Sequence, residues 1–175
     1  MNTESVFTTK TFESISEMCS VLKIAESELL MDHIMDYHNS YVGIFFEGYP
    51  PIGLAYGGYG TKPQLQVLDQ STTILIGFDA TIVAIDYTTH TQLFRSECFV
   101  LFHEYYYMKA LGVIIVTCEL DMYVIDTAGN RIWGVGFRDI GTDYKICGDI
   151  LHITTIEGWE FDYEILTGNP VISDT

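Results

Sequence analysis

Acidic and aromatic side chains alternate in one stretch near the end of the chain. The stretch reads Glu157-Gly158-Trp159-Glu160-Phe161-Asp162-Tyr163-Glu164. In a β-strand its three aromatic side chains would share one face, and its last three acids would share the other. Carboxylates in a row repel one another, and a solvated surface would normally relieve this with interspersed Lys. The pattern therefore favours a surface that receives a basic partner, the alternative being an acidic face that only keeps the protein soluble.

Two further stretches combine the same residue types. Acids and turn residues run from Asp139 to Tyr144, and a run of three tyrosines follows Glu104. Buried Tyr and Trp side chains often anchor protein interfaces, and carboxylates favour positively charged partners. We therefore predict a partner-binding surface. Its candidate residues are Glu104, Tyr105, Tyr106, Tyr107, Asp139, Asp143, Glu157, Trp159, Glu160, Asp162 and Glu164.

The histidines stand in no pattern that catalysis or metal binding requires. His33 and His38 are five residues apart, whereas two ligands on one helical face stand four apart. His103 and Glu104 could exchange a proton, but no nucleophile has a recognisable setting. The sequence contains no Gly-x-Ser-x-Gly, Gly-x-x-x-x-Gly-Lys or Cys-x-x-Cys motif. We expect no enzyme activity, no cofactor and no metal.

The charge balance points the same way as the acidic stretches. The 175 residues include 24 Asp and Glu against 8 Lys and Arg, a formal net charge of -16. With 48% hydrophobic and 14% aromatic residues, the chain is a folded acidic protein rather than a disordered one. Residues 139–175 hold eight acids and one base. This excess weighs against binding nucleic acids or anionic membranes, both of which recruit Lys and Arg.

The N-terminus and the cysteines bear on cellular location. Residues 1–10 lack the apolar core of a secretory signal. The longest apolar run, Leu111 to Cys118, is far shorter than the roughly 20 residues of a membrane helix. We expect a cytoplasmic protein whose four cysteines are reduced, buried thiols.

The elements that must position these residues are mainly β. In residues 11–38, Phe12, Ile15, Met18 and Leu22 recur three or four apart, which predicts one or two short amphipathic helices, broken near Lys23. Residues 41–175 alternate short apolar runs with turns, which predicts antiparallel strands in a single domain spanning residues 1–175. The expected strands are 41–46, 64–68, 73–78, 81–86, 92–96, 99–103, 113–119, 122–126, 131–135, 149–155, 159–165 and 170–172.

Three segments, residues 73–94, 113–133 and 151–171, follow one pattern of strand, turn, strand, acid, turn and strand. The acids are Asp86, Asp126 and Glu164, spaced by 40 and 38 residues, about the length of a propeller blade. Each acid is expected to cap its turn, and Gly129 and Gly168 to adopt positive φ.

The run from Tyr123 to Trp133 resembles the blade signature of quinoprotein-like β-propeller repeats, in which a Trp docks on a neighbouring blade. The first and third copies end in Phe94 and Val171 instead of Trp. The resemblance implies an open stack of about three blade-like hairpin repeats or a β-sandwich, and no quinone is carried over. Local hairpin chemistry alone, without any propeller ancestry, produces the same pattern.

As a small, acidic protein without catalytic residues, the chain resembles in type the immunity proteins of contact-dependent and polymorphic bacterial toxin systems. That resemblance implies inhibition of a basic toxin, expected to be a nuclease, by occlusion of its active site. Two alternatives remain open. One is a propeller-like adaptor. The other is a small-ligand-binding module with a concave aromatic pocket near Gly48 to Gly60, Trp133 or Trp159.

Overall fold

The computed structural model describes residues 6–31, 37–58, 62–68 and 71–171. The chain divides into two compact units, Met1–Glu97 and Cys98–Thr175. The prediction of one domain over residues 1–175 stays a prediction.

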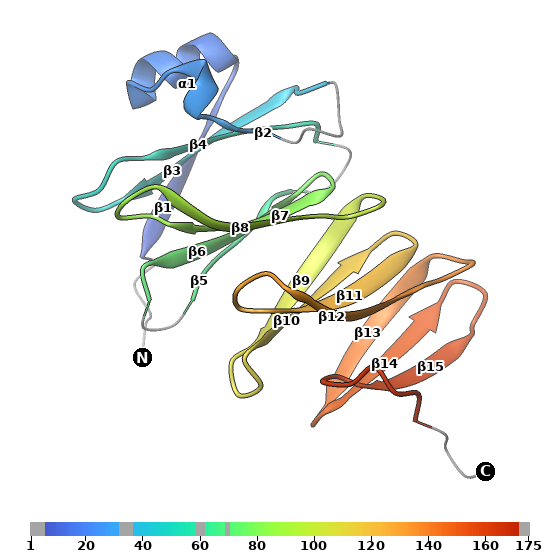
Figure 1. Ribbon diagram of the computed structural model, residues 1–175. Helices are drawn as coiled ribbons and strands as arrows, with labels where there is room; N and C mark the ends of the chain where they lie inside the picture. The colour runs from blue at the N-terminus through green and yellow to red at the C-terminus, as the bar shows by residue number, and fades with distance from the viewer. Residues whose placement is uncertain (1–5, 32–36, 59–61, 69–70, 172–175) are drawn as a thin grey trace. The chain divides into compact units, whose positions relative to one another are not determined.

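The first unit holds β1 (Phe7–Phe12), α1 (Ile15–Leu22), the 3-10 helix η1 (Glu26–Glu28), β2 (Leu30–Met31), β3 (Ser40–Phe46), β4 (Ile52–Tyr56), β5 (Gln64–Val67), β6 (Thr73–Phe78), β7 (Thr81–Asp86) and β8 (Thr91–Glu97) (Figure 1). The second holds β9 (Phe102–Met108), β10 (Val113–Cys118), β11 (Asp121–Asp126), β12 (Arg131–Gly136), β13 (Gly141–Cys147), β14 (Ile150–Thr155) and β15 (Glu160–Glu164).

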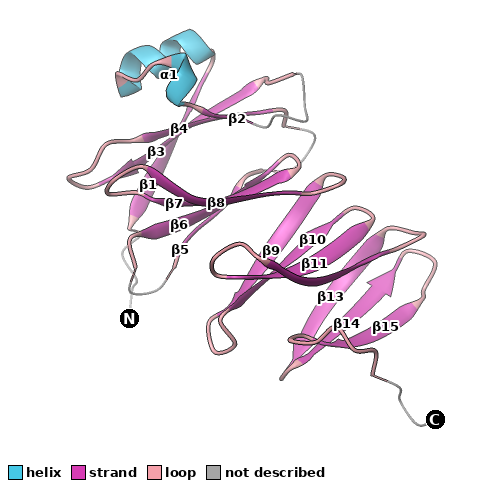
Figure 2. Cartoon of the chain, in the orientation of Figure 1, coloured by secondary structure: helices cyan, strands magenta, loops and turns pink. Residues whose placement is uncertain are grey.

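The first sheet has the strand order β1-β3-β4-β2 and is covered on one face by α1 (Figure 2). Ser14 begins the helix because its hydroxyl accepts a hydrogen bond from the amide of Glu17 at 3.2 Å. Met18 and Leu22 are the buried residues of the helix. The sheet keeps a glycine beneath them, because a Cβ at Gly53 would lie 2.4 Å from the side chain of Leu29.

The opposite face of this sheet packs on the second sheet, which has the order β5-β6-β7-β8. β6 and β7 pair antiparallel and are buried along almost their whole length, so both read as continuous apolar runs rather than alternating ones. The buried core between the two sheets consists of Val42, Ile44, Phe46, Ile52, Leu54, Ile74, Ile76, Phe78, Val83 and Ile85.

The second unit contains a four-stranded sheet, in the order β12-β11-β10-β9, and a three-stranded sheet, in the order β13-β14-β15. Each pairing is antiparallel between strands that follow one another in the chain. Burial of branched aliphatic side chains between the two sheets stabilises the unit. Its buried core consists of Val113, Ile115, Met122, Val124, Leu151, Ile153 and Ile165.

The predicted fold class is confirmed, because the described chain is mainly antiparallel β with one short α-helix near its start. The helical prediction over residues 11–38 is correct only in part. α1 ends at Leu22, and its C-cap residue Lys23 has a φ of 58°, in the left-handed region. Where a second helix was expected, Leu30 and Met31 form β2, which pairs parallel with β4. Residues 32–36 of the expected helix lie outside the described residues.

Three strands escaped prediction for different physical reasons. β1 is an exposed edge strand of mostly polar residues, and β13 also carries charged and polar side chains. β4 includes Gly53 and Ala55 and stands among turn-forming residues, which hid its pattern. The segment predicted as a strand at residues 99–103 was wrong in position, since Phe99 is 94% exposed and β9 begins at Phe102.

Two further expectations require correction. The predicted strand at residues 170–172 is reduced to an isolated bridge between Pro170 and Tyr163, with Ile172 outside the described residues. The four cysteines are unpaired, but only Cys98 and Cys118 are buried, whereas Cys19 is half-buried and Cys147, at the end of β13, is exposed.

The three repeated segments are confirmed as equivalent pieces of three different sheets. Asp86 ends β7 and accepts hydrogen bonds from the amide and hydroxyl of Thr88, at 2.9 and 2.6 Å. Asp126 ends β11 and accepts from the amides of Ala128 and Asn130, at 2.9 and 2.8 Å. Each acid therefore caps its turn, as the repeat predicts.

The third copy uses a longer side chain for the same purpose. Glu164 ends β15 and accepts hydrogen bonds from the hydroxyl of Thr167 at 2.6 Å and the side-chain amide of Asn169 at 3.4 Å. Gly129 and Gly168 have φ of 87° and 71°, which confirms their predicted conformation. The fold contains one more sheet than the three repeats indicate, the one formed by β1 to β4.

Candidate functional site

A concave aromatic pocket of about 380 Å³ lies in the second unit. Phe137 follows β12, while Phe161 and Tyr163 come from the inner face of β15. The ring centroids of Phe137 and Phe161 are 6.1 Å apart, and those of Phe161 and Tyr163 are 6.5 Å apart. Trp159 also lines the pocket and is 63% exposed. We call this cavity the C-terminal pocket, lined by Val135, Gly136, Phe137, Arg138, Asp139, Thr155, Glu157, Trp159, Phe161 and Tyr163.

Carboxylates order the loop that presents Trp159. Asp139 accepts hydrogen bonds through Oδ1 from the amide of Ile140 and through Oδ2 from the amide of Glu157, both at 2.7 Å. The Glu157 carboxylate in turn lies 3.4 Å from the indole Nε1 of Trp159. Asp139 is therefore a positioning residue for the turn, whereas Glu157 and Trp159 are exposed.

The structure thus brings together three of the residues predicted from the sequence, Asp139, Glu157 and Trp159. Sequence reasoning missed Val135, Phe137 and Arg138 as members of the same pocket. The signal that could have found them is the alternation of Trp133, Val135 and Phe137, which places their side chains on one side of the chain.

Behind the pocket, Trp133 packs the two sheets of the unit together. Its indole Nε1 donates a hydrogen bond to the carbonyl of Ile165 at 2.7 Å, and its ring lies 5.5 Å from that of Tyr163. A Cβ on Gly168 would lie 2.5 Å from the Trp133 ring, so the turn after β15 must have glycine there. Trp133 docks on the next sheet, as the blade signature implies, and its half-buried ring is used in packing.

The outer face of the three-stranded sheet carries the predicted acidic row, but with basic residues beside it. Lys145, His152 and Asp162 stand side by side in the register of β13, β14 and β15. His152 Nδ1 lies 2.6 Å from the Asp162 carboxylate, and Lys145 Nζ lies 2.8 Å from that of Asp143. The neighbouring strands β13 and β14 therefore place a lysine and a histidine next to the acidic row.

The three acids of the row differ in their surroundings. Asp162 faces His152, and Glu164 caps a turn, while Glu160 is exposed beside Lys145 and His152 in a shallow cavity of about 430 Å³. The hydrogen bond from Lys145 and the negative charge of Asp143 raise the pKa of that lysine, with a smaller contribution from Glu160. The three acids therefore do not form one uniform face of unpartnered carboxylates.

The tyrosine run lies on β9 and does not line the C-terminal pocket. Tyr105 is 1% exposed and is therefore a core residue that no partner can reach. The hydroxyl of Tyr106 donates a hydrogen bond to the Glu104 carboxylate, and burial together with this bond raises the pKa of Tyr106. Tyr107 is half-buried. Neighbouring residues of β9 therefore differ in exposure, because Tyr105 is buried in the core while Glu104 and Tyr106 are half-buried.

The described part of the chain contains neither a metal-binding cluster nor a membrane-spanning helix. No group of three or more His, Cys, Asp and Glu residues there is arranged to hold a metal ion. Among the same residues, no helix has the length and apolarity needed to cross a membrane.

Comparison with known proteins identifies the fold. No family model and no curated protein sequence matches the chain. Among solved structures, the computationally designed Ika4 protein is 14% identical with a TM-score of 0.53, over 67% of this chain and 75% of that one. The β-propeller domain of Cps50 (Swd1) from Myceliophteria thermophila is 13% identical with a TM-score of 0.52, over 62% of this chain and 36% of that one.

A third structure, Sqt1 of Saccharomyces cerevisiae, is 11% identical with a TM-score of 0.53, over 76% of this chain and 43% of that one. The chain therefore spans less than half the length of Sqt1 and of the Swd1 domain. At these identities the likeness concerns the fold alone, which is β-propeller-like.

Proposed function

We propose that this chain is an acidic binding protein whose C-terminal pocket receives a basic side chain of a partner protein. The observation that carries the proposal is the exposed Trp159 ring beside the Glu157 carboxylate, at the mouth of an aromatic cavity. An Arg or Lys side chain inserted there would lay its apolar stem on the rings and its charge near the carboxylate. The net charge of -16 would speed the encounter with such a partner.

The partner class that fits this chemistry best is a basic toxin, in particular a nuclease. A nuclease cleft is lined with basic residues that hold phosphates, and an acidic protein can occupy that cleft in place of the nucleic acid. The chain would then act in the cytoplasm as an immunity protein that occludes the active site. Trp159 is the proposed anchor, and the surrounding carboxylates fix its orientation.

The test begins with identification of the partner by affinity capture from native lysate, followed by an assay of its nuclease activity. We expect the chain to inhibit that activity stoichiometrically and the complex to weaken as salt concentration rises. Trp159→Ala should weaken binding at least about tenfold, since anchoring aromatic residues dominate interface energies. Ile132→Ala is the matched control, because Ile132 is an exposed apolar residue of the same unit outside the pocket.

The same assay can refute the proposal. Capture of neutral or acidic partners only, or a nuclease that stays active with the chain bound, would contradict it. So would equal losses of affinity from Trp159→Ala and Ile132→Ala, since the pocket would then have no special part in binding.

The pocket also favours a second candidate function, the binding of a small ligand without catalysis. Arg138 stands among the lining residues with the aromatic rings, a combination suited to a sugar or a small organic acid. Trp159 fluorescence would report such binding. A saturable change with a small acid that Arg138→Gln abolishes, together with absence of any basic protein partner, would favour this function over the first.

A further inference from the structure

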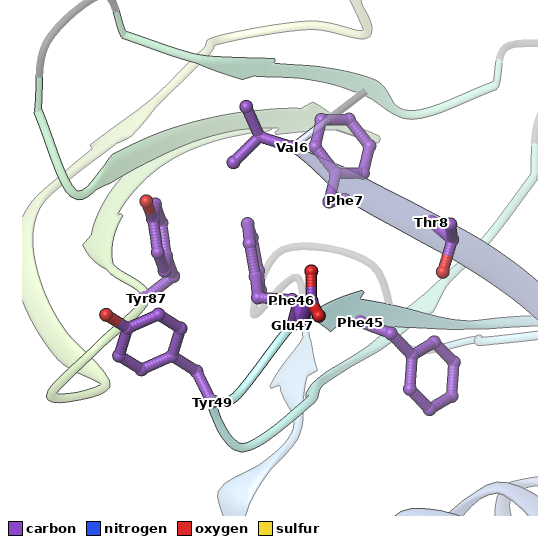
Figure 3. Close-up of a pocket in the computed structure, with 8 residues that line it drawn as sticks. All are labelled: Val6, Phe7, Thr8, Phe45, Phe46, Glu47, Tyr49 and Tyr87. Atoms are coloured by element: carbon purple, nitrogen blue, oxygen red, sulfur yellow. The ribbon is translucent and has the colours of Figure 1, made fainter. Parts of the chain in front are cut away.

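Four aromatic rings in the first unit form an open cup, far in the sequence from the C-terminal pocket. The rings belong to Phe7, Phe46, Tyr49 and Tyr87, which we call the aromatic cup (Figure 3). Phe46 stacks on Tyr87 with centroids 4.2 Å apart and planes 5° apart. The ring centroids of Phe7 and Phe46 are 6.0 Å apart, with the two planes tilted by 50°. Tyr49 meets Tyr87 edge-on, with centroids 5.6 Å apart. Together they border a cavity of about 550 Å³.

The backbone holds these rings in place before any ligand arrives. Phe7 and Phe46 are register partners in the pairing of β1 with β3. The amide of Tyr49 donates a hydrogen bond to the carbonyl of Phe46 at 3.3 Å, across a turn in which Gly48 has φ of 78°. The amide of Tyr87 donates to the carbonyl of Thr72 at 2.9 Å. Binding to the cup would therefore need little reordering of the chain.

One carboxylate, that of Glu47, accompanies the rings. Glu47 is exposed, directly follows β3, and lies among the ring-bearing residues in Figure 3. The described residues that line the cavity include Glu47 and no Lys, Arg or His. The surrounding sequence is acidic as well, since residues 1–97 hold twelve acids and four bases. An anionic ligand is therefore repelled from the cup.

The geometry points to a ligand that carries an alkylated ammonium group. Aromatic faces attract a cation through their quadrupole, and sets of aromatic rings suit quaternary ammonium groups especially well. Methyl groups on the nitrogen would fill the apolar space between Val6, Phe7 and Tyr49, while Glu47 faces the positive charge. A bare ammonium is strongly hydrated and loses more on entering such a site. We propose that the aromatic cup binds a small organic cation with a methylated ammonium head group, independently of any protein partner.

Choline and its neutral isostere, in which carbon replaces the nitrogen, test this proposal because they share a shape and differ in charge. Titration of the full chain, followed by proton NMR of the ligand methyl groups, gives both affinities. We expect choline to bind saturably, with upfield methyl shifts caused by the rings, and about tenfold more tightly than the isostere. Equal affinities, or no saturable shift for choline, would overturn the proposal.

Variants locate the site within the chain. Tyr49→Ala and Glu47→Gln should each weaken choline binding severalfold, and both residues are exposed, so folding should be preserved. Tyr37→Ala and Glu13→Gln are matched controls, since both residues are exposed in the same unit and lie outside the cavity. Thermal unfolding verifies that each variant is folded. If the controls weaken choline binding as much as the cup variants do, the cation binds elsewhere and the assignment to the cup is wrong.

Discussion

Asp86 shows how much of the chain's acidity is used for local structure. Its Oδ1 accepts hydrogen bonds from Thr88, and its Oδ2 accepts one from the hydroxyl of Thr72 at 2.8 Å. These bonds lower the pKa of Asp86 from 3.8 to about 2, with the side chain of Thr88 as the largest cause. Asp126 has a lowered pKa for the same reason, chiefly because of the side chain of Asn130. Sequence acidity is therefore not all available for partner binding.

This gives a prediction for the pH dependence of stability. Because the pKa of Asp86 is lower in the folded chain, its contribution to stability is present above pH 3.8 and is lost as the pH falls through about 2. We expect Asp86→Asn to lower the free energy of unfolding at neutral pH, and the gap from the unmodified chain to shrink over that acidic range. Urea unfolding at several pH values measures it. Asp149→Asn is the exposed control, and a gap that is constant with pH would contradict the prediction.

At the scale of the element, a residue with positive φ follows α1 and another lies in the turn after β15. Lys23 adopts φ of 58° after α1, a conformation in which glycine suffers no steric cost from a Cβ. Gly168 adopts φ of 71° in the turn after β15, with the ring of Trp133 directly against it. The first position can therefore be improved by substitution, whereas the second allows only glycine.

Lys23→Gly is expected to stabilise the protein by about 0.5–1 kcal/mol, because glycine relieves the left-handed strain at the helix end. Ser20→Gly, at an exposed position inside the same helix, should destabilise it by a similar amount. Denaturant unfolding of both variants measures the difference. Destabilisation by both would show that Lys23 is not the C-cap of the helix in solution.

The packing of the second unit predicts a difference between two turn glycines. Gly168→Ala introduces positive-φ strain and a clash with Trp133. Gly148→Ala introduces the strain alone, since among the described residues no atom beyond its chain neighbours lies within 4 Å of where a Cβ would be. We expect Gly168→Ala to cost about 1–3 kcal/mol more than Gly148→Ala in denaturant unfolding. Equal costs would mean that Trp133 does not rest on this turn.

At the scale of the whole molecule, the negative charge is divided evenly between the two units. Residues 1–97 and 98–175 each hold twelve acids and four bases. Within the second unit the excess is concentrated after residue 138, because residues 98–138 hold four acids and three bases. Self-repulsion acts on each unit, and it opposes folding when the charges are unscreened.

Salt should therefore stabilise the protein. We expect the midpoint of thermal unfolding to rise as NaCl increases from low concentration, since screening shortens the range of repulsion to about 10 Å at 0.1 M. KCl should have the same effect, because screening depends on ionic strength rather than on ion identity. A midpoint that is constant or falls with NaCl would show that favourable ion pairs outweigh the net repulsion.

The strands could be predicted wherever burial leaves a strong pattern, and the site could be predicted only in part. β6 and β7 were predicted with their bounds because both consist of uninterrupted apolar runs between turns. Trp159 was identified as a candidate because it stands in an acidic stretch. Phe137 and Arg138, which line the same pocket, lie in the loop between β12 and β13, whereas Trp159 lies in the loop between β14 and β15. Short-range sequence patterns do not show which loops lie next to each other in the fold.

The sequence alone determined the β class, the acidic charge and the turn-capping acids, because alternation, composition and i to i+2 hydrogen bonds are local properties of the chain. The tertiary structure decided which acids and tyrosines reach the surface. Lys145 and His152 stand beside Asp162 of the acidic row only because three strands align in register. Tyr105 is buried while Trp159 is exposed, because burial depends on the sheet that packs against each side chain, and that contact is made between residues distant in sequence.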